Sequence, residues 1–363
     1  MQSLHINQFS TEHEGKTQRV SARINDIPLW FESSNAKLYP SPEGFGSAVL
    51  FAALTHRVDM VIDAPISRRW LENVDQLMVK AHEWWKLKPI KIHCPQLVED
   101  PLSTEGGVGL CFSGGADSFY SLYNYRNKKI DRLIFIHGYD IGLDDKHRIA
   151  SFKQTLRQVA KAKEAMPVMM KTNLRLHPAH TGVDWQRSHG GALVGAASMI
   201  VGLRDLVISA SFPHVYNQPW GTHWETDHLW SSGQLTVHHF GAELWRTEKI
   251  IAMKDDELVQ KHLRVCWENK NSDVNCCCCE KCLRTMLALD QCGVLHKYAT
   301  FSSMDLTKAI EAVGRVDTYV IPVYETFQLR CTSPDVSAGL AKLISNSKAF
   351  AVTQEQQKKR KMN

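Results

Sequence analysis

Between residues 108 and 211, apolar segments of strand length alternate with longer segments that have helical spacing. The expected strands cover 108–112, 133–140, 167–175 and 206–211, and the expected helices cover 117–126, 146–163 and 190–203. Apolar strands that alternate with helices are typical of a parallel sheet with helices on both faces and ligands at the carboxyl ends of its strands. The sequence therefore predicts an α/β fold with a doubly wound, Rossmann-like parallel sheet.

The regions before and after this alternating pattern have different predicted secondary structure. Residues 18–33 alternate like a pair of strands around an Asn-Asp turn, and apolar residues at helical spacing follow. A polar segment with Pro and Gly, 97–107, has the composition of a linker. We predict an N-terminal α+β module over 1–105, the parallel-sheet domain over 106–240, a C-terminal helical lobe over 241–350 and a disordered basic tail over 351–363.

Composition limits the class of protein. The chain has 363 residues, 44% of them hydrophobic, and an excess of basic over acidic residues of only 43 to 38, which is weak support for a nucleic-acid partner. The first residues lack the pattern of an export signal, and the longest nearly uncharged stretch, 190–203, is too short to span a bilayer. We therefore expect a cytoplasmic protein with no membrane partner.

The segment SGGADS, residues 113–118, follows the first strand of the alternating region. Because the glycines leave the backbone amides unobstructed at the start of a helix, such a loop favours an anion, and phosphate above all. The loop matches neither the GxxxxGK[ST] nor the GxGxxG pattern. The alternative is a tight strand-to-helix turn in which Ser113 caps the helix.

Five of the ten cysteines lie between Cys276 and Cys282, which favours a reducing compartment and a metal site over disulfides. The spacing Cys-x9-Cys-x2-Cys-x2-Cys suits a closed tetrahedral zinc site with the ligands Cys266, Cys276, Cys279 and Cys282. An iron–sulfur cluster is the alternative, although nothing in the sequence suggests electron transfer. Cys277 or Cys278 could replace a neighbour as ligand.

The SGGADS loop resembles the SGGxDS loop of the PP-loop ATP pyrophosphatase superfamily, whose members cleave ATP to AMP and pyrophosphate. The resemblance implies ATP and Mg²⁺ as ligands, with pyrophosphate and magnesium held by Ser113, Gly114, Gly115, Asp117 and Ser118. Segments 137–145 and 172–175 lie where this superfamily forms the edges of its adenosine pocket. His137, Gly138 and Asn173 are the residues that we expect there.

The loop and the downstream cysteines together resemble the 7-cyano-7-deazaguanine synthase family over roughly residues 108–290. In that family zinc holds the C-terminal lobe and ATP activates a carboxylate as an acyl adenylate. This chain departs from the family in three ways: its first hundred residues have no counterpart, the substrate loop of the synthase is not recognisable, and Cys277 replaces the usual Gly. We expect an adenylating enzyme with an acceptor of its own, either a small molecule, such as a 7-deazaguanine-like planar compound, or a peptide or protein.

Segment 212–233 is dense in aromatic, histidine and acidic side chains. We expect it to bind a planar acceptor through Trp220, His223, Trp224, Glu225 and Asp227. The alternative is a surface loop whose tryptophans pack on the sheet, and a metal site at His214, His223 and His228 is less favoured. Catalysis would use Asp117 and a cation near the α-phosphate, for which the candidates are Lys171, Arg175, Arg246 and Lys249. Arg246 and Lys249, with Glu243, could instead form a surface charge ladder.

Two other functions stay open at this point. A PP-loop enzyme that modifies tRNA would need a basic appendage with exposed aromatic residues, and the N-terminal module carries too many acids to favour this. A non-catalytic assembly protein would have no need of an intact SGGADS loop. The sequence leaves open whether the chain forms a homodimer.

Overall fold

The computed structural model describes residues 3–99, 106–270 and 274–362, so residues 100–105 of the predicted linker lie outside the described part. The chain divides into two compact units. The sheet unit contains residues 1–113 and 117–245, and the helical unit contains residues 114–116 and 246–363. The predicted boundary at residue 241 thus lies close to the observed change of unit at Arg246, whereas the predicted N-terminal module and parallel-sheet domain belong to one unit.

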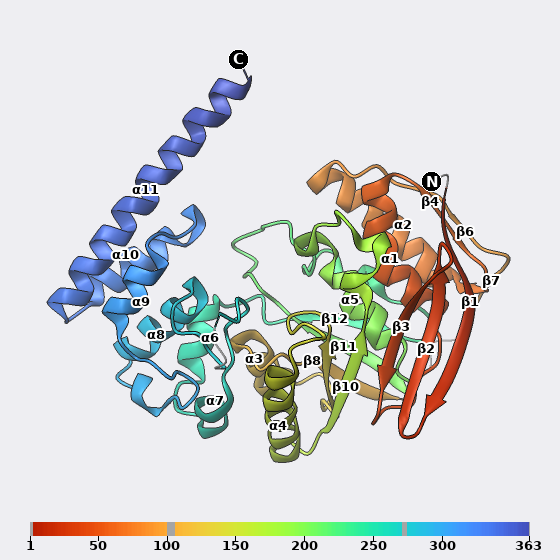
Figure 1. Cartoon of the computed structure of the whole chain (residues 1–363), viewed down its shortest axis with the longest axis horizontal. Coiled ribbons are helices and arrows are strands. Elements are labelled where there is room, and N and C mark those ends of the chain that lie inside the picture. Colours follow the sequence, from red (N-terminus) through yellow and green to blue (C-terminus); the bar gives the residue numbers. More distant parts are fainter. Residues whose placement is uncertain (1–2, 100–105, 271–273, 363) are drawn as a thin grey trace. The chain divides into compact units, whose positions relative to one another are not determined.

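The sheet unit is built on one ten-stranded sheet with the strand order β12-β11-β8-β9-β10-β3-β2-β1-β4-β6 (Figure 1). The strands from β12 to β10 are mutually parallel, β10-β3-β2-β1 are antiparallel, and β1-β4-β6 are parallel again. The strands are β1 Ser3–Glu14, β2 Thr17–Ile24, β3 Ile27–Ser33, β4 Asp59–Ile62, β6 Ile92–His93, β8 Gly107–Cys111, β9 Arg132–His137, β10 Met166–Thr172, β11 Leu203–Ser209 and β12 Thr236–Phe240. The large, mostly parallel sheet confirms the predicted α/β class.

Helices cover the parallel half of the sheet on both faces. On one face Phe135 of β9 stacks against Phe152 of α4, and Tyr120 of α3 stacks against Phe240 of β12. On the other face Ile134 and Ile208 belong to a hydrophobic core shared with α1, α2 and α5. The helices of the sheet unit are α1 Pro42–His56, α2 Arg68–Trp85, α3 Ala116–Asn124, α4 Lys146–Ala162 and α5 Trp185–Ser198, with short 3₁₀ turns η1 Leu174–Leu176, η2 Pro178–His180 and η3 Asp227–Trp230 and a two-stranded sheet of β5 Ile66–Ser67 and β7 Leu97–Val98.

The N-terminal strands join the parallel strands through the β3–β10 pair, in which Thr172 is opposite Phe31. Just beyond β10, the Asn173 side chain accepts a hydrogen bond from the Trp30 amide at 3.0 Å and donates one to the Pro28 carbonyl at 3.0 Å. This side-chain amide extends the backbone pairing past the end of the strand. The predicted strand pair of residues 18–33 is confirmed as β2 and β3, whose turn holds Asn25 and Asp26 at positive φ.

Close contact between α1 and α5 depends on glycine. A Cβ atom at Gly195 would lie 2.7 Å from the Gly44 carbonyl oxygen, and one at Gly191 would lie 2.4 Å from the Ser47 carbonyl oxygen. The glycine-rich segment that the sequence shows at 190–203 therefore lets two buried helices approach each other. Among the described residues, no helix has both the length and the apolar composition needed to cross a membrane.

The helical unit consists of short helices and one long one. They are α6 Arg246–Ala252, α7 Glu257–His262, α8 Glu280–Gln291, α9 Leu306–Val313, α10 Ile321–Arg330 and α11 Pro334–Met362, with 3₁₀ turns η4 Leu295–Lys297 and η5 Thr318–Val320. We predicted a disordered tail over 351–363, whereas α11 continues to Met362. The reason is local: the tail contains no Pro or Gly, and its Gln, Glu, Lys and Arg residues are all good helix formers.

Candidate metal centre and candidate nucleotide-binding loop

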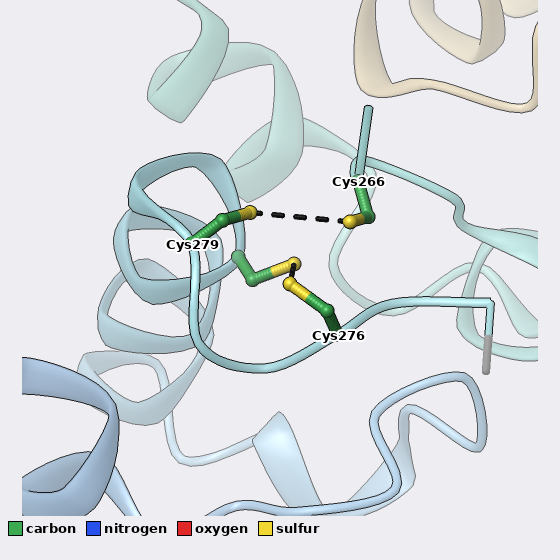
Figure 2. A group of neighbouring side chains, drawn as sticks. Cys266, Cys276 and Cys279 are labelled. Atoms are coloured by element: carbon green, nitrogen blue, oxygen red, sulfur yellow. Dashed lines mark hydrogen bonds between the residues drawn. The ribbon is translucent and has the colours of Figure 1, made fainter. Parts of the chain in front are cut away.

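Four buried cysteines of the helical unit come together in the way that the spacing predicts. Cys266 follows α7, Cys276 and Cys279 lie in the segment before α8, and Cys282 lies in the first turn of α8. Their Sγ atoms all lie within 4.8 Å of one another, and the pairs Cys276–Cys282 and Cys266–Cys279 are both 4.0 Å apart (Figure 2). No other group of this kind occurs among the described His, Cys, Asp and Glu residues.

The donor set fits a tetrahedral zinc ion. With Zn–S bonds of about 2.3 Å, a tetrahedral ion holds its sulfur ligands about 3.8 Å apart, close to the separations found here. Hydrogen bonds from the Cys279 and Cys282 thiols lower the pKa of Cys266, and the pKa values of Cys279 and Cys282 are raised by the same contacts. Because the thiolate is the form of cysteine that ligates a metal, a divalent cation bound here would take the place of the thiol protons. These residues could bind a metal such as zinc.

Asn275 organises the loops that carry the cysteines. It is fully buried, and its Oδ1 accepts hydrogen bonds from the amides of Val265 and Cys266 at 2.8 and 3.2 Å. Its Nδ2 donates to the carbonyls of Leu263 and Thr300 at 2.9 and 3.3 Å. One side chain therefore links the backbone at and before Cys266, the residue before Cys276, and Thr300. Our sequence reasoning missed it, although an Asn directly before a ligand was the available signal.

The two neighbouring cysteines have other surroundings. Cys277 is buried and has a φ of 56°, the left-handed region that favours Gly, the residue that the resembling family uses there. Its thiol donates to the Asn275 carbonyl at 3.4 Å. Cys278 is partly exposed, and burial, together with Cys276, raises the pKa of its thiol to about 11. The group of four excludes both residues.

The SGGADS loop begins one residue after Phe112, at the carboxyl end of β8, and runs into α3. Gly114 has a φ of 73°, in the region that favours glycine, and its carbonyl accepts a hydrogen bond from the Arg264 amide at 2.8 Å. Asp117 lies in the first turn of α3, and Ser118 is buried there. The loop therefore has the strand–glycine–helix form that the sequence predicts.

The strand order places this loop at a reversal of the sheet. From β8 the chain passes outward to β9 and β10 on one side, and it then returns to β11 and β12 on the other side. In open α/β sheets, ligands bind at the carboxyl ends of the strands where the order reverses in this way. At the carboxyl end of β11, the strand beside β8, the buried hydroxyl of Ser209 has no hydrogen-bond partner among the described residues.

The three residues predicted for the adenosine pocket lie at the ends of the neighbouring strands. His137 ends β9; its Nε2 is 2.8 Å from the Gly142 carbonyl oxygen, and burial lowers the pKa of its imidazole. Gly138 has a φ of 105°, and a Cβ atom there would meet the Thr172 carbonyl oxygen at 2.3 Å. Asn173 follows β10, but its amide group is bonded to β3.

The four candidate cations have different surroundings. Lys171 pairs with Glu32 of β3 at 3.0 Å, and Arg175 donates to the Tyr139 carbonyl at 2.7 Å while stacking over Trp185. In the helical unit, Arg246 begins α6 and Lys249 is only 1% exposed, so Lys249 is not part of a surface charge ladder.

The third member of the proposed charge ladder, Glu243, precedes α6. It accepts a hydrogen bond from the Tyr120 hydroxyl at 2.6 Å. Burial, together with this contact, raises the pKa of Tyr120 to about 12.

The residues predicted to bind a planar acceptor have different contacts from one another. Trp220 lines an aromatic pocket of about 220 Å³, its opening included, together with Trp84, Trp85 and Trp230. Trp224 is 38% exposed and contacts the ring of His214. Glu225 pairs with Lys80 of α2 at 2.9 Å. The structure thus places the two tryptophans in different surroundings, Trp220 at the pocket and Trp224 partly exposed.

Asp227 and His223 form a buried pair of neighbours. Asp227 is completely buried, and its Oδ1 accepts a hydrogen bond from the His223 amide at 3.0 Å. Its Oδ2 is 2.7 Å from Nδ1 of His239 in β12, a residue that our sequence reasoning missed. The Nδ1 of His223 accepts from the Glu225 amide at 3.1 Å, and burial lowers the pKa of His223.

Comparisons of the chain with family models, with curated proteins and with solved structures find no match. What can be said of its activity therefore rests on the loop, the cysteine centre and the polar residues at the carboxyl edge of the sheet.

Proposed function

We propose that this chain is an ATP-dependent adenylating enzyme that cleaves ATP to AMP and pyrophosphate and activates a carboxylate or a similar group of its acceptor. The observation that carries the proposal is the position of the SGGADS loop. It leaves β8 at the reversal of strand order, where α/β sheets bind ligands, and it opens into a helix of nine residues. A turn that only connected strand to helix could occur at any strand.

The loop residues would bind the pyrophosphate portion of ATP. Amides around Gly114 and Gly115 can approach phosphate oxygens because no side chain obstructs them, and the hydroxyls of Ser113 and Ser118 add donors. Asp117 would hold Mg²⁺ against the same oxygens. These groups would stabilise the charge that accumulates on pyrophosphate as an acceptor oxygen attacks the α-phosphorus in line.

For the cation near the α-phosphate, the candidates stay Lys171, Arg175, Arg246 and Lys249. Lys171 is paired with Glu32, and Arg175 contacts a carbonyl and an aromatic ring. Lys249 is buried. Zinc, when bound by the four cysteines, would supply folding free energy rather than chemistry, because a site with four protein ligands leaves no open position.

The test separates ATP cleavage between the α and β phosphates from ordinary ATP hydrolysis. The protein is incubated with Mg²⁺-ATP and the small-molecule filtrate of a cell lysate, and nucleotides are separated by chromatography. We expect AMP and pyrophosphate; ADP and phosphate would overturn the proposal. Exchange of labelled pyrophosphate into ATP, measured with the filtrate and separately with tRNA, distinguishes a small acceptor from an RNA acceptor.

Variants connect the activity to the loop. Gly115→Val should abolish AMP formation because a branched side chain obstructs the amides, and Asp117→Asn should lower Mg²⁺-dependent turnover at least tenfold. Lys249→Met should do the same if Lys249 acts at the α-phosphate. The matched control is Glu248→Ala, which changes an exposed neighbour on α6 and should keep wild-type turnover. Wild-type activity in Gly115→Val would exclude the loop as the ATP site.

A further inference from the structure

Two consecutive histidines of β12 each pair with a buried aspartate, but on opposite faces of the sheet. His238 Nε2 is 2.7 Å from Asp205 Oδ1, and His239 Nδ1 is 2.7 Å from Asp227 Oδ2. Successive side chains of a strand point to opposite faces. The His238 ring accordingly contacts Tyr125, which follows α3, whereas His239 contacts η3 on the other face.

The two Asp–His pairs differ in the further partners of their aspartates. Asp205 also binds the Lys128 ammonium group at 2.6 Å, so His238 belongs to a structural charge network. No lysine or arginine pairs with Asp227 among the described residues, and its second carboxylate oxygen accepts a hydrogen bond from the His223 amide. The His239 side chain is 8% exposed, and Asp227 is its one hydrogen-bonding partner within the described residues.

Two other histidines of the sheet unit, His177 and His189, use both ring nitrogens, whereas Nε2 of the buried His180 has no hydrogen-bond partner among the described residues. His177 lies 3.1 Å from the Ile27 carbonyl oxygen through Nε2 and accepts from the Ala179 amide through Nδ1. His189 contacts the Trp185 carbonyl through Nδ1 and the Thr222 hydroxyl through Nε2. In His239 the carboxylate acceptor fixes the proton on Nδ1, which leaves the lone pair of Nε2 for a partner outside the protein.

His239 lies at the carboxyl edge of the sheet, near the SGGADS loop. His239 is the penultimate residue of β12, opposite Ile208 of β11, at the same carboxyl edge from which Ser113 leaves β8. Since β11 alone lies between β8 and β12, the two strand ends are about 10 Å apart. Cys111, the last residue of β8, lies close enough to Asp227 for the carboxylate to add to the rise of the thiol pKa that burial causes.

We propose that His239 is the general base that accepts a proton from the nucleophile displacing AMP, with Asp227 as its positioning residue. The inference rests on the adenylating function proposed above. Nε2 of His239 takes a proton from the ammonium form of the amine, and the freed nitrogen lone pair forms a bond to the activated carbonyl carbon. The carbon–oxygen bond to AMP breaks with its electron pair on AMP, and the second excess proton of the nitrogen passes to solvent. Asp227 stabilises the imidazolium that forms.

The groups around the pair come from three elements. His189 of α5 and Cys111 of β8 interact electrostatically with Asp227, and His223 interacts with both Asp227 and His239. Glu225 and His214 act on His223 from the same segment. None of these five residues is a hydrogen-bond partner of His239, so substitution of His239 should leave their own contacts in place.

The test compares two nucleophiles. Ammonium is protonated near neutral pH and needs a base, whereas hydroxylamine is largely unprotonated and does not. AMP formation is measured with Mg²⁺-ATP and the small-molecule filtrate of a cell lysate, with ammonium chloride or hydroxylamine added. For His239→Gln we expect a loss of about 100-fold with ammonium and less than about threefold with hydroxylamine. Asp227→Asn should show the same selectivity with a loss of about tenfold.

His238→Gln is the matched control, because it removes the neighbouring histidine of the other Asp–His pair and should affect neither reaction. Equal losses with both nucleophiles in His239→Gln would show a structural role and overturn the proposal, as would no loss with either. These outcomes presuppose AMP formation by the wild type. If the wild type forms no AMP, the adenylating function fails and the assignment of the base fails with it.

Discussion

The cysteine centre of the helical unit and the polar carboxyl edge of the sheet unit are assembled in opposite ways. All four thiols come from residues 266–282, and two of the loops that carry them are fixed by a single side chain, Asn275. At the sheet edge, Ser113 and the Asp227–His239 pair come from distant parts of the chain, and only the strand order places β8 and β12 near each other in one sheet. Local chemistry defines the first site, and long-range pairing defines the second.

The largest effect that separates the two regions is expected on metal removal. If zinc supplies folding free energy to the helical unit, a chelator or the substitution Cys282→Ser should unfold that unit, since structural zinc contributes on the order of 10 kcal/mol in small domains. The sheet unit has its own hydrophobic core and should stay folded. Limited proteolysis followed by mass spectrometry should find new cleavage sites after residue 246 and few before it.

Elemental analysis provides the matching measurement, with about one zinc per chain expected in the untreated protein. Cys292→Ser is the control, because this cysteine is outside the group of four and should keep the metal. A metal-free Cys282→Ser protein with unchanged protease resistance would show that the thiols do not hold the unit together.

The contrast also explains how much the sequence could predict. Spacing alone identified the four cysteines that come together, because two CxxC turns bring thiols close whatever the rest of the fold does. Alternating strands and helices predicted the α/β sheet and the position of the loop after β8. In both cases the information lies within a few neighbouring residues.

Pairing between segments that are distant in the chain could not be predicted from neighbouring residues in this way. The pairing of β3 with β10 brings Glu32 to Lys171 and Trp30 to Asn173, so two residues predicted for the ATP site also have protein partners that the sequence did not indicate. The sequence shows His238 and His239 as neighbours, but only the strand order reveals which one meets Asp227. Burial of Lys249 likewise depends on how α6 packs, and the spacing of charged residues in the sequence does not reveal which face of that helix is buried.

The second largest effect should follow from Asn275→Ala. Four hydrogen bonds of a buried amide disappear, and two backbone amides and two carbonyls lose their partner, so the free energy of unfolding of the helical unit should fall by roughly 3 kcal/mol. Chemical denaturation with the metal present measures it. Asn346→Ala, whose exposed amide makes one bond to the Gly314 carbonyl, is the control and should change stability little. Wild-type stability in Asn275→Ala would mean that the metal alone organises these loops.

Acid should weaken the sheet unit through its buried histidines. Burial lowers the pKa of His180 to about 4, whereas an unfolded histidine titrates near 6.5. Between these values the unfolded chain binds the extra proton, so this contribution is complete above pH 6.5 and is lost as the pH falls toward 4. By pH 5 the loss should reach roughly 2 kcal/mol. Urea unfolding followed by tryptophan fluorescence between pH 7.5 and 5 measures it, and His180→Phe should flatten the dependence. An equal slope in wild type and variant would contradict the assignment to His180.

The smallest effect is expected at Cys277, a residue next to the group of four thiols that is not part of it. Its φ of 56° costs a residue with a Cβ atom about 1 kcal/mol, which glycine would relieve. Glycine also increases the entropy of the unfolded chain, at a cost of about 0.5 to 1 kcal/mol, and removes a weak thiol hydrogen bond of 3.4 Å. Cys277→Gly should therefore change the free energy of unfolding by less than about 1 kcal/mol and keep one zinc per chain. Cys276→Gly, one residue earlier, should lose the metal. Loss of zinc in Cys277→Gly would instead make Cys277 a ligand and break the assignment of the four thiols.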